Sequence, residues 1–215
     1  MYFRIGGGNT RAAVYRVSYT GGESTAPAQL ENPEGAKERK LRRDLEAFHG
    51  KADTKAVAAA WPHLGSADRT LRYAARIALE SQPVAEWQPH IGKEKDPRAA
   101  MTALLALARV GPRESQSELL QILNGMPPLA KLAEEDKILK LRVLQLSFVR
   151  QGPPSIGGLV KKLVTDLDAA YPQESEKVNR ELLQVLVYLQ APRVVEETLA
   201  RMSQAKTQED LLHSL

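Results

Sequence analysis

The residues of this chain most able to do chemistry are arginines that recur within successive apolar segments. Arg42, Arg72 and Arg142 each follow a leucine in such a segment, and Arg180 occupies a similar place further along the chain. A guanidinium group presents its donors in a fixed fork that matches carboxylates and phosphates. A row of these arginines could therefore make polar contacts from one segment to the next, or it could bind an anion.

An acidic residue and a further arginine extend this set. The segment from Ser66 to Ala75 has an acidic turn residue, then an apolar–arginine pair, then two alanines whose small side chains let helices approach closely. Asp68 and Arg72 could hydrogen-bond along the inner row of a helical stack. The next such segment has Thr102 where an arginine is expected, which interrupts a continuous ladder. The candidate residues for a polar ladder or for anion contacts are Arg42, Asp68, Arg72, Arg76, Arg142 and Arg180.

Other chemistries lack the residues that they need. The chain has no cysteine, which excludes disulfides, zinc–thiolate sites, cysteine nucleophiles and c-type haem attachment within it. Gly6-Gly7-Gly8 lacks the Lys-Ser/Thr ending of a phosphate-binding loop. The four histidines, His49, His63, His90 and His213, show no spacing typical of metal ligands. We therefore predict no catalytic residue, no metal and no cofactor, and we do not expect this chain to be an enzyme.

The charge of the chain is mildly basic. Thirty lysines and arginines stand against 26 acidic residues, for a net charge of +4. The densest basic run is Lys37, Arg39, Lys40, Arg42 and Arg43. It could contact phosphates, or it could be a solvated helix face. No aromatic residues interleave with it, as a single-strand binder would require.

Helices must position most of these residues. Apolar residues at helical spacing cluster in segments 41–48, 71–79, 101–108, 141–148 and 182–189, and shorter, more polar segments near 54–61, 83–92, 113–124, 156–170 and 193–203 alternate with them. A helical pair that recurs every ~30–47 residues is typical of HEAT or armadillo arrays. The sequence predicts an all-α, HEAT-like α-solenoid of about five helical pairs over residues 37–215.

Residues 1–36 have a different pattern. Residues 1–21 alternate apolar and polar residues around a glycine-rich turn, which predicts a β-hairpin. Residues 22–36 have the composition of a linker. Because a lone hairpin is only marginally stable in water, we expect it to be the end of a β-domain whose remainder is missing. Ser66 is predicted to cap a helix, and Gly50, Gly111 and Gly152 are predicted to end helices in the left-handed conformation.

Two stretches together resemble a known family. Residues 2–7 with 14–21 resemble the final blade of a β-propeller, and residues 41–50, 61–66 and 72–80 resemble the helical region that follows it. This order is similar to large bacterial proteins described as membrane-bound dehydrogenase-like or haem-binding-domain proteins, in which HEAT repeats follow a propeller and a c-type cytochrome domain often comes next. Tyr171-Pro172 and residues 179–183 also look like later helices of that family.

The resemblance implies that this chain is a fragment of a larger redox protein exported to the periplasm or the cell surface. Neither the propeller site nor a Cys-x-x-Cys-His motif is present, so no catalytic residue carries over. We expect a non-catalytic scaffold or connector, or a protein-interaction module, whose partners are propeller and cytochrome-like domains or other proteins. The alternative is binding of nucleic acid or another polyanion through a basic concave surface. The chain contains no run of ~18 apolar residues, so we expect no membrane insertion.

Overall fold

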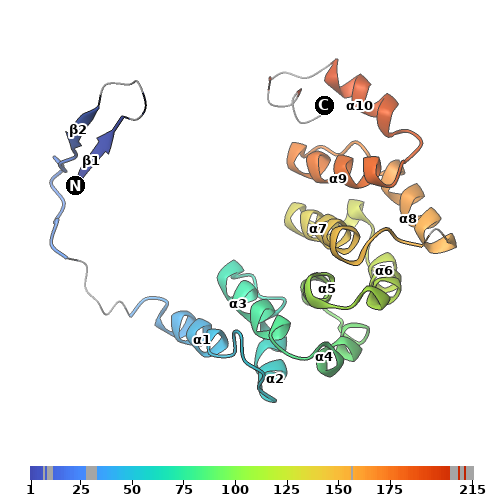
Figure 1. Ribbon diagram of the computed structural model, residues 1–215, viewed down its shortest axis with the longest axis horizontal. Helices are drawn as coiled ribbons and strands as arrows, with labels where there is room; N and C mark the ends of the chain where they lie inside the picture. Colours follow the sequence, from blue (N-terminus) through green and yellow to red (C-terminus); the bar gives the residue numbers. More distant parts are fainter. Residues whose placement is uncertain are drawn as a thin grey trace. The chain divides into compact units, whose positions relative to one another are not determined.

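The computed structural model describes residues 1–6, 8, 12–27, 33–155, 157–203, 208 and 211. Contacts divide the chain into two compact units, Met1–Ala36 and Lys37–Leu215. The first unit carries two strands and the second carries the helices (Figure 1). Within the described residues, no helix is both long enough and apolar enough to cross a bilayer.

The first unit contains the predicted hairpin. β1 (Tyr2–Ile5) pairs antiparallel with β2 (Ala13–Arg16), with Phe3 opposite Tyr15. Their rings stack with centroids 5.4 Å apart, yet both side chains remain exposed. β2 ends at Arg16, earlier than the pattern through Tyr19 indicates, and part of the predicted turn lies outside the described residues.

The second unit is helical, and the all-α class predicted for it is confirmed. The described residues form ten α-helices: α1 (Ala36–Glu46), α2 (Ala56–Ala60), α3 (Arg69–Glu80), α4 (Val84–Ile91), α5 (Pro97–Val110), α6 (Gln116–Gly125), α7 (Glu134–Gln151), α8 (Gly158–Ala169), α9 (Glu176–Tyr188) and α10 (Val194–Met202). Short 3₁₀ turns, η1 (Trp61–His63), η2 (Arg113–Ser115) and η3 (Leu129–Lys131), lie between some of them. From α2 to α10, shorter helices alternate with longer ones, as the periodicity predicted.

The long helices pack on one another in chain order. α3 contacts α5, α5 contacts α7, and α7 contacts α9, while α4, α6 and α8 pack alongside them (Figure 1). Both helices bury small residues completely, Ala75 and Ala78 on α3 and Ala103 on α5. One apolar cluster runs through the unit from Leu45 to Val194. The middle helix α5 is therefore covered on two sides by the long helices α3 and α7.

The start of α3 differs from the prediction that Ser66 caps it. Asp68 is the N-cap, and its Oδ1 accepts hydrogen bonds from the backbone N–H groups of Thr70 (2.7 Å) and Leu71 (3.3 Å). Ser66 lies two residues before Asp68, and its Oγ accepts a hydrogen bond from the Asp68 N–H at 3.2 Å. The extended backbone at Asp68 places a carboxylate in front of the free N–H groups of the first turn.

A positive φ is found at two of the three glycines predicted to end helices, although Gly50 lies beyond the end of α1 at Glu46. Gly50 and Gly152 have φ values of 69° and 91°, which favour glycine. Gly111 was predicted wrongly, because its φ is −71°. A side chain there would bring a Cβ within 2.5 Å of the Leu107 carbonyl oxygen, so close approach and not backbone conformation explains the glycine.

Candidate functional site

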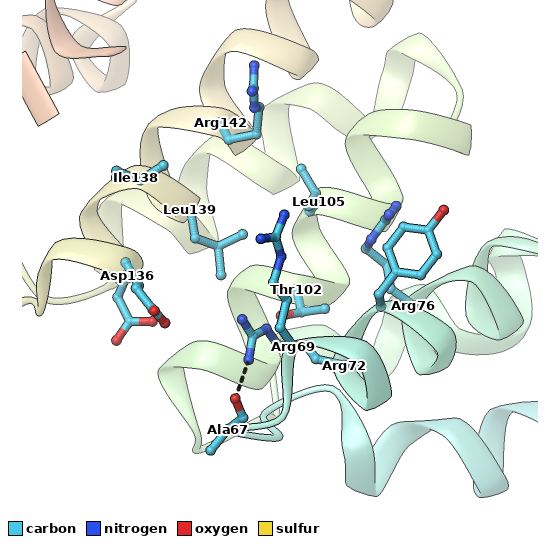
Figure 2. Close-up of a pocket in the computed structure, with 12 residues that line it drawn as sticks. Ala67, Arg69, Arg72, Arg76, Thr102, Leu105, Asp136, Ile138, Leu139 and Arg142 are labelled. Atoms are coloured by element: carbon cyan, nitrogen blue, oxygen red, sulfur yellow. Dashed lines mark hydrogen bonds between the residues drawn. The ribbon is translucent and has the colours of Figure 1, made fainter. Parts of the chain in front are cut away.

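A groove over the three central long helices brings together half of the predicted site residues. It encloses about 470 Å³ and includes Arg72, Arg76 and Arg142 in its lining (Figure 2). The other predicted residues, Arg42, Asp68 and Arg180, do not line it. The full lining is Ala67, Arg69, Arg72, Tyr73, Arg76, Thr102, Leu105, Glu135, Asp136, Ile138, Leu139 and Arg142, and we call it the arginine groove.

Helical spacing explains how each element contributes to the arginine groove. Residues three, four and seven positions apart share one face of a helix, so α3 presents Arg69, Arg72 and Arg76 together. The middle helix α5 supplies half-buried Leu105, and α7 supplies half-buried Ile138 and a second leucine, Leu139. The groove therefore combines an apolar floor with guanidinium groups.

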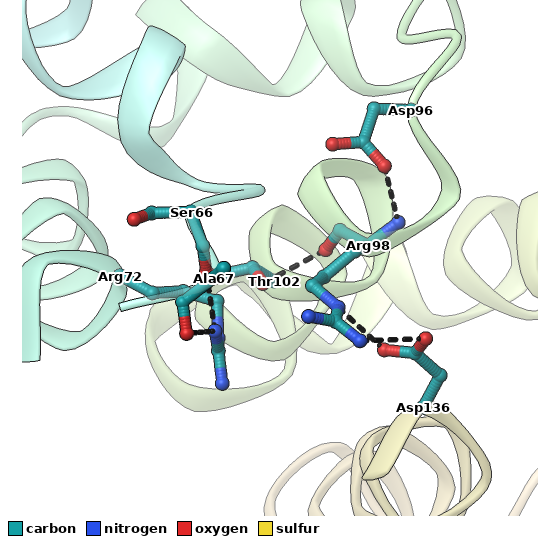
Figure 3. Close-up of polar contacts among 7 residues, drawn as sticks. All are labelled: Ser66, Ala67, Arg72, Asp96, Arg98, Thr102 and Asp136. Carbon is teal, nitrogen blue, oxygen red and sulfur yellow. Dashed lines mark hydrogen bonds and ion pairs between the residues drawn. The ribbon is translucent and has the colours of Figure 1, made fainter. Parts of the chain in front are cut away.

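The predicted candidates make their contacts locally. Arg72 Nη1 donates to the carbonyl oxygens of Ser66 and Ala67, in the turn just before its own helix (Figure 3). The pKa of Asp68 is lowered first by the backbone N–H groups that it caps and only to a lesser extent by the charge of Arg72.

Arg42, Arg76 and Arg142 also contact residues of their own helices. Arg42 pairs with Glu46 (3.3 Å), Arg76 with Glu80, and Arg142 donates to Gln145 (3.3 Å). These contacts run along a helix and do not cross from one helical pair to the next.

Polar contacts that do cross between long helices come from residues that the sequence analysis missed. Arg98 on α5 forms a two-pronged ion pair with Asp136 on α7, at 2.7 and 2.9 Å (Figure 3). This hydrogen-bonded carboxylate raises the pKa of Arg98. Arg109 on α5 reaches Glu80 on α3 at 2.8 Å. A signal for Arg98 was available, since it lies one turn before Thr102, the position where an arginine was expected.

The crossing pair Arg98–Asp136 and the Arg76–Glu80 pair within α3 determine which charged groups of the arginine groove already have an ion-pair partner. Asp136 is engaged by Arg98 through both oxygens, and Arg76 is engaged by Glu80. Within the described part of the chain, Arg69, Arg72 and Arg142 form no ion pair with a carboxylate. Of the two acidic residues in the lining, Asp136 is paired with Arg98, and Glu135 takes part in neither of the two ion pairs. The groove thus has an excess of positive charge over an apolar floor. Arg69 was missed at the sequence level, although its spacing from Arg72 pointed to a shared face.

The basic cluster of the first helix lies elsewhere. In α1, Lys40 pairs with Asp44 at 2.6 Å and Arg42 with Glu46, so acidic residues one turn later offset part of its charge. None of its residues lines the arginine groove.

The described residues of the arginine groove offer binding groups. In the groove, the Thr102 hydroxyl donates to the Arg98 carbonyl at 2.8 Å and Asp136 is held in its ion pair, so neither is placed as a free nucleophile or base. Across the ranges that the structure describes, no group of three or more acidic or histidine residues could hold a metal ion. His49 contacts the Ala74 carbonyl oxygen at 2.9 Å, and His213 lies outside the described residues.

Comparison of the chain with protein-family models, with curated proteins and with solved structures finds no match. The resemblance to propeller–HEAT–cytochrome proteins, with the export that it implies, stays a prediction.

Proposed function

We propose that this chain is a non-catalytic protein-interaction module built as a HEAT-like α-solenoid of about five helical pairs. The packing of α3 on α5, α5 on α7 and α7 on α9, with shorter helices alongside, supports the solenoid. In such an array each repeat contacts its neighbours, and the stacked repeats form an extended surface for binding.

The arginine groove is the observation that carries this proposal. Arginine and apolar residues are the side chains that protein interfaces use most for affinity. Arg69, Arg72 and Arg142 lack carboxylate partners among the described residues, and they line the same groove as Leu105 and Leu139. A partner protein would place acidic groups against these arginines and apolar groups against these leucines.

Exposed apolar side chains on both terminal elements support a connecting role. Phe3 and Tyr15 are exposed on the hairpin, and Val195 and Leu199 are exposed on α10. Exposed apolar clusters commonly mark surfaces that another protein covers. We propose, from the resemblance, that the covering domains are a propeller and a cytochrome-like domain of an exported redox protein.

A second candidate function is the binding of nucleic acid or another polyanion. It is favoured by Arg69, Arg72 and Arg142, which have no carboxylate partner among the described residues, and by the net charge of +4. A polyanion complex would weaken steeply with added salt, because counterions compete for the phosphate contacts.

A capture experiment separates the two functions. The chain would be used as bait to capture its binding partners at ~50 and ~300 mM salt. Screening of exposed charges rises sharply over this range. A double variant, Arg69→Gln with Arg142→Gln, removes groove charge. Arg150→Gln is the matched control, since Arg150 lies on the same helix as Arg142, is exposed and does not line the groove.

We expect a protein partner that persists at the higher salt with the wild type and with Arg150→Gln, and that is lost with the double variant. Recovery of nucleic acid alone, released as salt rises, would replace the protein-interaction proposal with the second candidate.

A further inference from the structure

The arginine groove also specifies the chemistry of its ligand, and this inference rests on the proposed interaction function. The positive groups lie on two sides of the apolar floor: Arg69 and Arg72 on α3, and Arg142 on α7. The floor between them comes from Leu105 of α5 and Leu139 of α7 (Figure 2). A complementary ligand has negative groups at both ends and an apolar group in the middle.

Helix packing sets the length of that ligand. Packed helices lie ~8–10 Å apart, so α3 and α7, which both contact α5, are separated by at most roughly 16–20 Å. The arginine side chains reach inward and shorten the distance between the charges. An extended peptide advances about 3.3 Å per residue, so roughly four to six residues would bridge the two positive sides.

The floor distinguishes a peptide from a nucleic acid. Phosphates and sugars have no group that benefits from contact with half-buried Leu105, Ile138 and Leu139. Binding of single strands uses several stacked aromatic rings, whereas Tyr73 is the one aromatic residue in the lining, and one face of its ring already lies 5.2 Å from the Arg76 guanidinium. Leucine-type side chains of a peptide gain from this floor because burial removes apolar surface from water.

We propose that the arginine groove binds an acidic peptide segment of a partner protein in which an apolar side chain lies between two groups of carboxylates. Carboxylates at one end pair with Arg69, whose forked donors suit a two-pronged contact, and with the donors of Arg72 that the Ser66 and Ala67 carbonyls do not use. Carboxylates at the other end pair with Arg142, and the apolar side chain packs on Leu105 and Leu139. Glu135 in the lining disfavours a ligand with negative charge along its whole length.

The probe that tests this is a fluorescein-labelled dodecapeptide with a Leu-Leu pair between two Asp/Glu clusters, followed by fluorescence anisotropy. A second peptide replaces the leucines with serines at equal charge, and a single-stranded oligonucleotide of equal charge serves as the polyanion. The protein forms are the wild type, Arg69→Gln/Arg142→Gln and Arg150→Gln, each checked for an unchanged circular dichroism spectrum and melting curve.

We expect the Leu-Leu peptide to bind about tenfold more tightly than the serine peptide, which corresponds to burial of about one apolar side chain. The Arg69→Gln/Arg142→Gln variant should bind it about tenfold more weakly, whereas Arg150→Gln should leave binding unchanged. Equal affinity for the leucine and serine peptides, or equal loss with Arg150→Gln, would overturn the proposed ligand chemistry.

A displayed library of random peptides distinguishes failure of the ligand chemistry from failure of the proposed function. Enrichment of acidic peptides with a central apolar residue supports the inference. Enrichment of peptides of another composition would overturn the inference and leave the interaction function standing. No peptide enrichment, together with salt-sensitive binding of the oligonucleotide, would overturn both.

Discussion

Lys140 offers a sharp test of the physical reasoning, because it is a cation placed inside the helical unit. Its residue is only 5% exposed, and its Nζ donates to the Pro127 carbonyl oxygen at 2.9 Å. Loss of water around the ammonium group lowers its pKa from 10.5 to about 8. The nearby charges of Asp166 and Lys162 act in opposite directions and have smaller effects.

The sign of the effect on stability follows from this lowered pKa. Below about pH 8 both the folded and the unfolded chain hold the proton, so the folded state bears the full cost of the buried charge. Between about pH 8 and 10.5 the folded state releases the proton while the unfolded state keeps it, so the free energy of unfolding rises with pH. At about 1.4 kcal/mol per pKa unit, the cost relieved between pH 7 and pH 10 is roughly 2–3 kcal/mol.

The assay compares urea unfolding of the wild type and Lys140→Met by far-ultraviolet circular dichroism at ~pH 7 and ~pH 10, the range that this pKa shift affects. Lys161→Met is the control, since Lys161 is an exposed lysine on α8. As pH rises, the free energy of unfolding of the wild type should increase by roughly 2–3 kcal/mol relative to that of Lys140→Met. The free energy of unfolding of Lys161→Met should change with pH as that of the wild type does. Parallel pH dependences of the wild type and Lys140→Met would show that Lys140 is not buried as a cation.

Three further outcomes follow from contacts in the structure. Asp96→Ala should lower the free energy of unfolding by about 1 kcal/mol by removing the α5 N-cap, while Asp96→Asn should be nearly neutral; equal losses would refute the capping role. A double-mutant cycle with Arg98→Gln and Asp136→Asn should give a coupling of about 1 kcal/mol that weakens with salt, and zero coupling would contradict the crossing pair. By hydrogen exchange, amides of β1 and β2 should be less protected than those of α5, and slow exchange in the strands would mean that something covers them.

The helical architecture was predictable because its signal is local. Apolar residues at helical spacing marked segment 101–108, and α5 extends this segment to Pro97–Val110. Segment 141–148 was marked in the same way, and it lies within α7. The choice of N-cap was not predictable in the same way. Ser66 and Asp68 are both good capping residues two positions apart, and the backbone conformation that selects Asp68 is decided by packing.

The site was harder to predict because its properties depend on contacts between distant segments. Arg72 and Arg142 were selected by their place in each repeat, and they do line one groove. The pairing of Arg98 with Asp136 joins residues 38 positions apart and depends on the register of α5 against α7. The burial of Lys140 depends likewise on the loop that contains Pro127. Neither the Arg98–Asp136 pair nor the burial of Lys140 produces a pattern in the sequence of a single helix.

Net charge alone would have been a poor guide to the ligand. The excess of +4 is spread over the whole chain, and many acidic residues have structural partners. Asp68 and Asp96 cap helices, and Asp136 and Glu80 hold crossing arginines. Because these carboxylates already have partners, the arginines of the groove retain positive charge for the proposed ligand even though the chain is only mildly basic. The charge that matters for recognition is therefore what remains after capping and packing, and it lies beside an apolar floor.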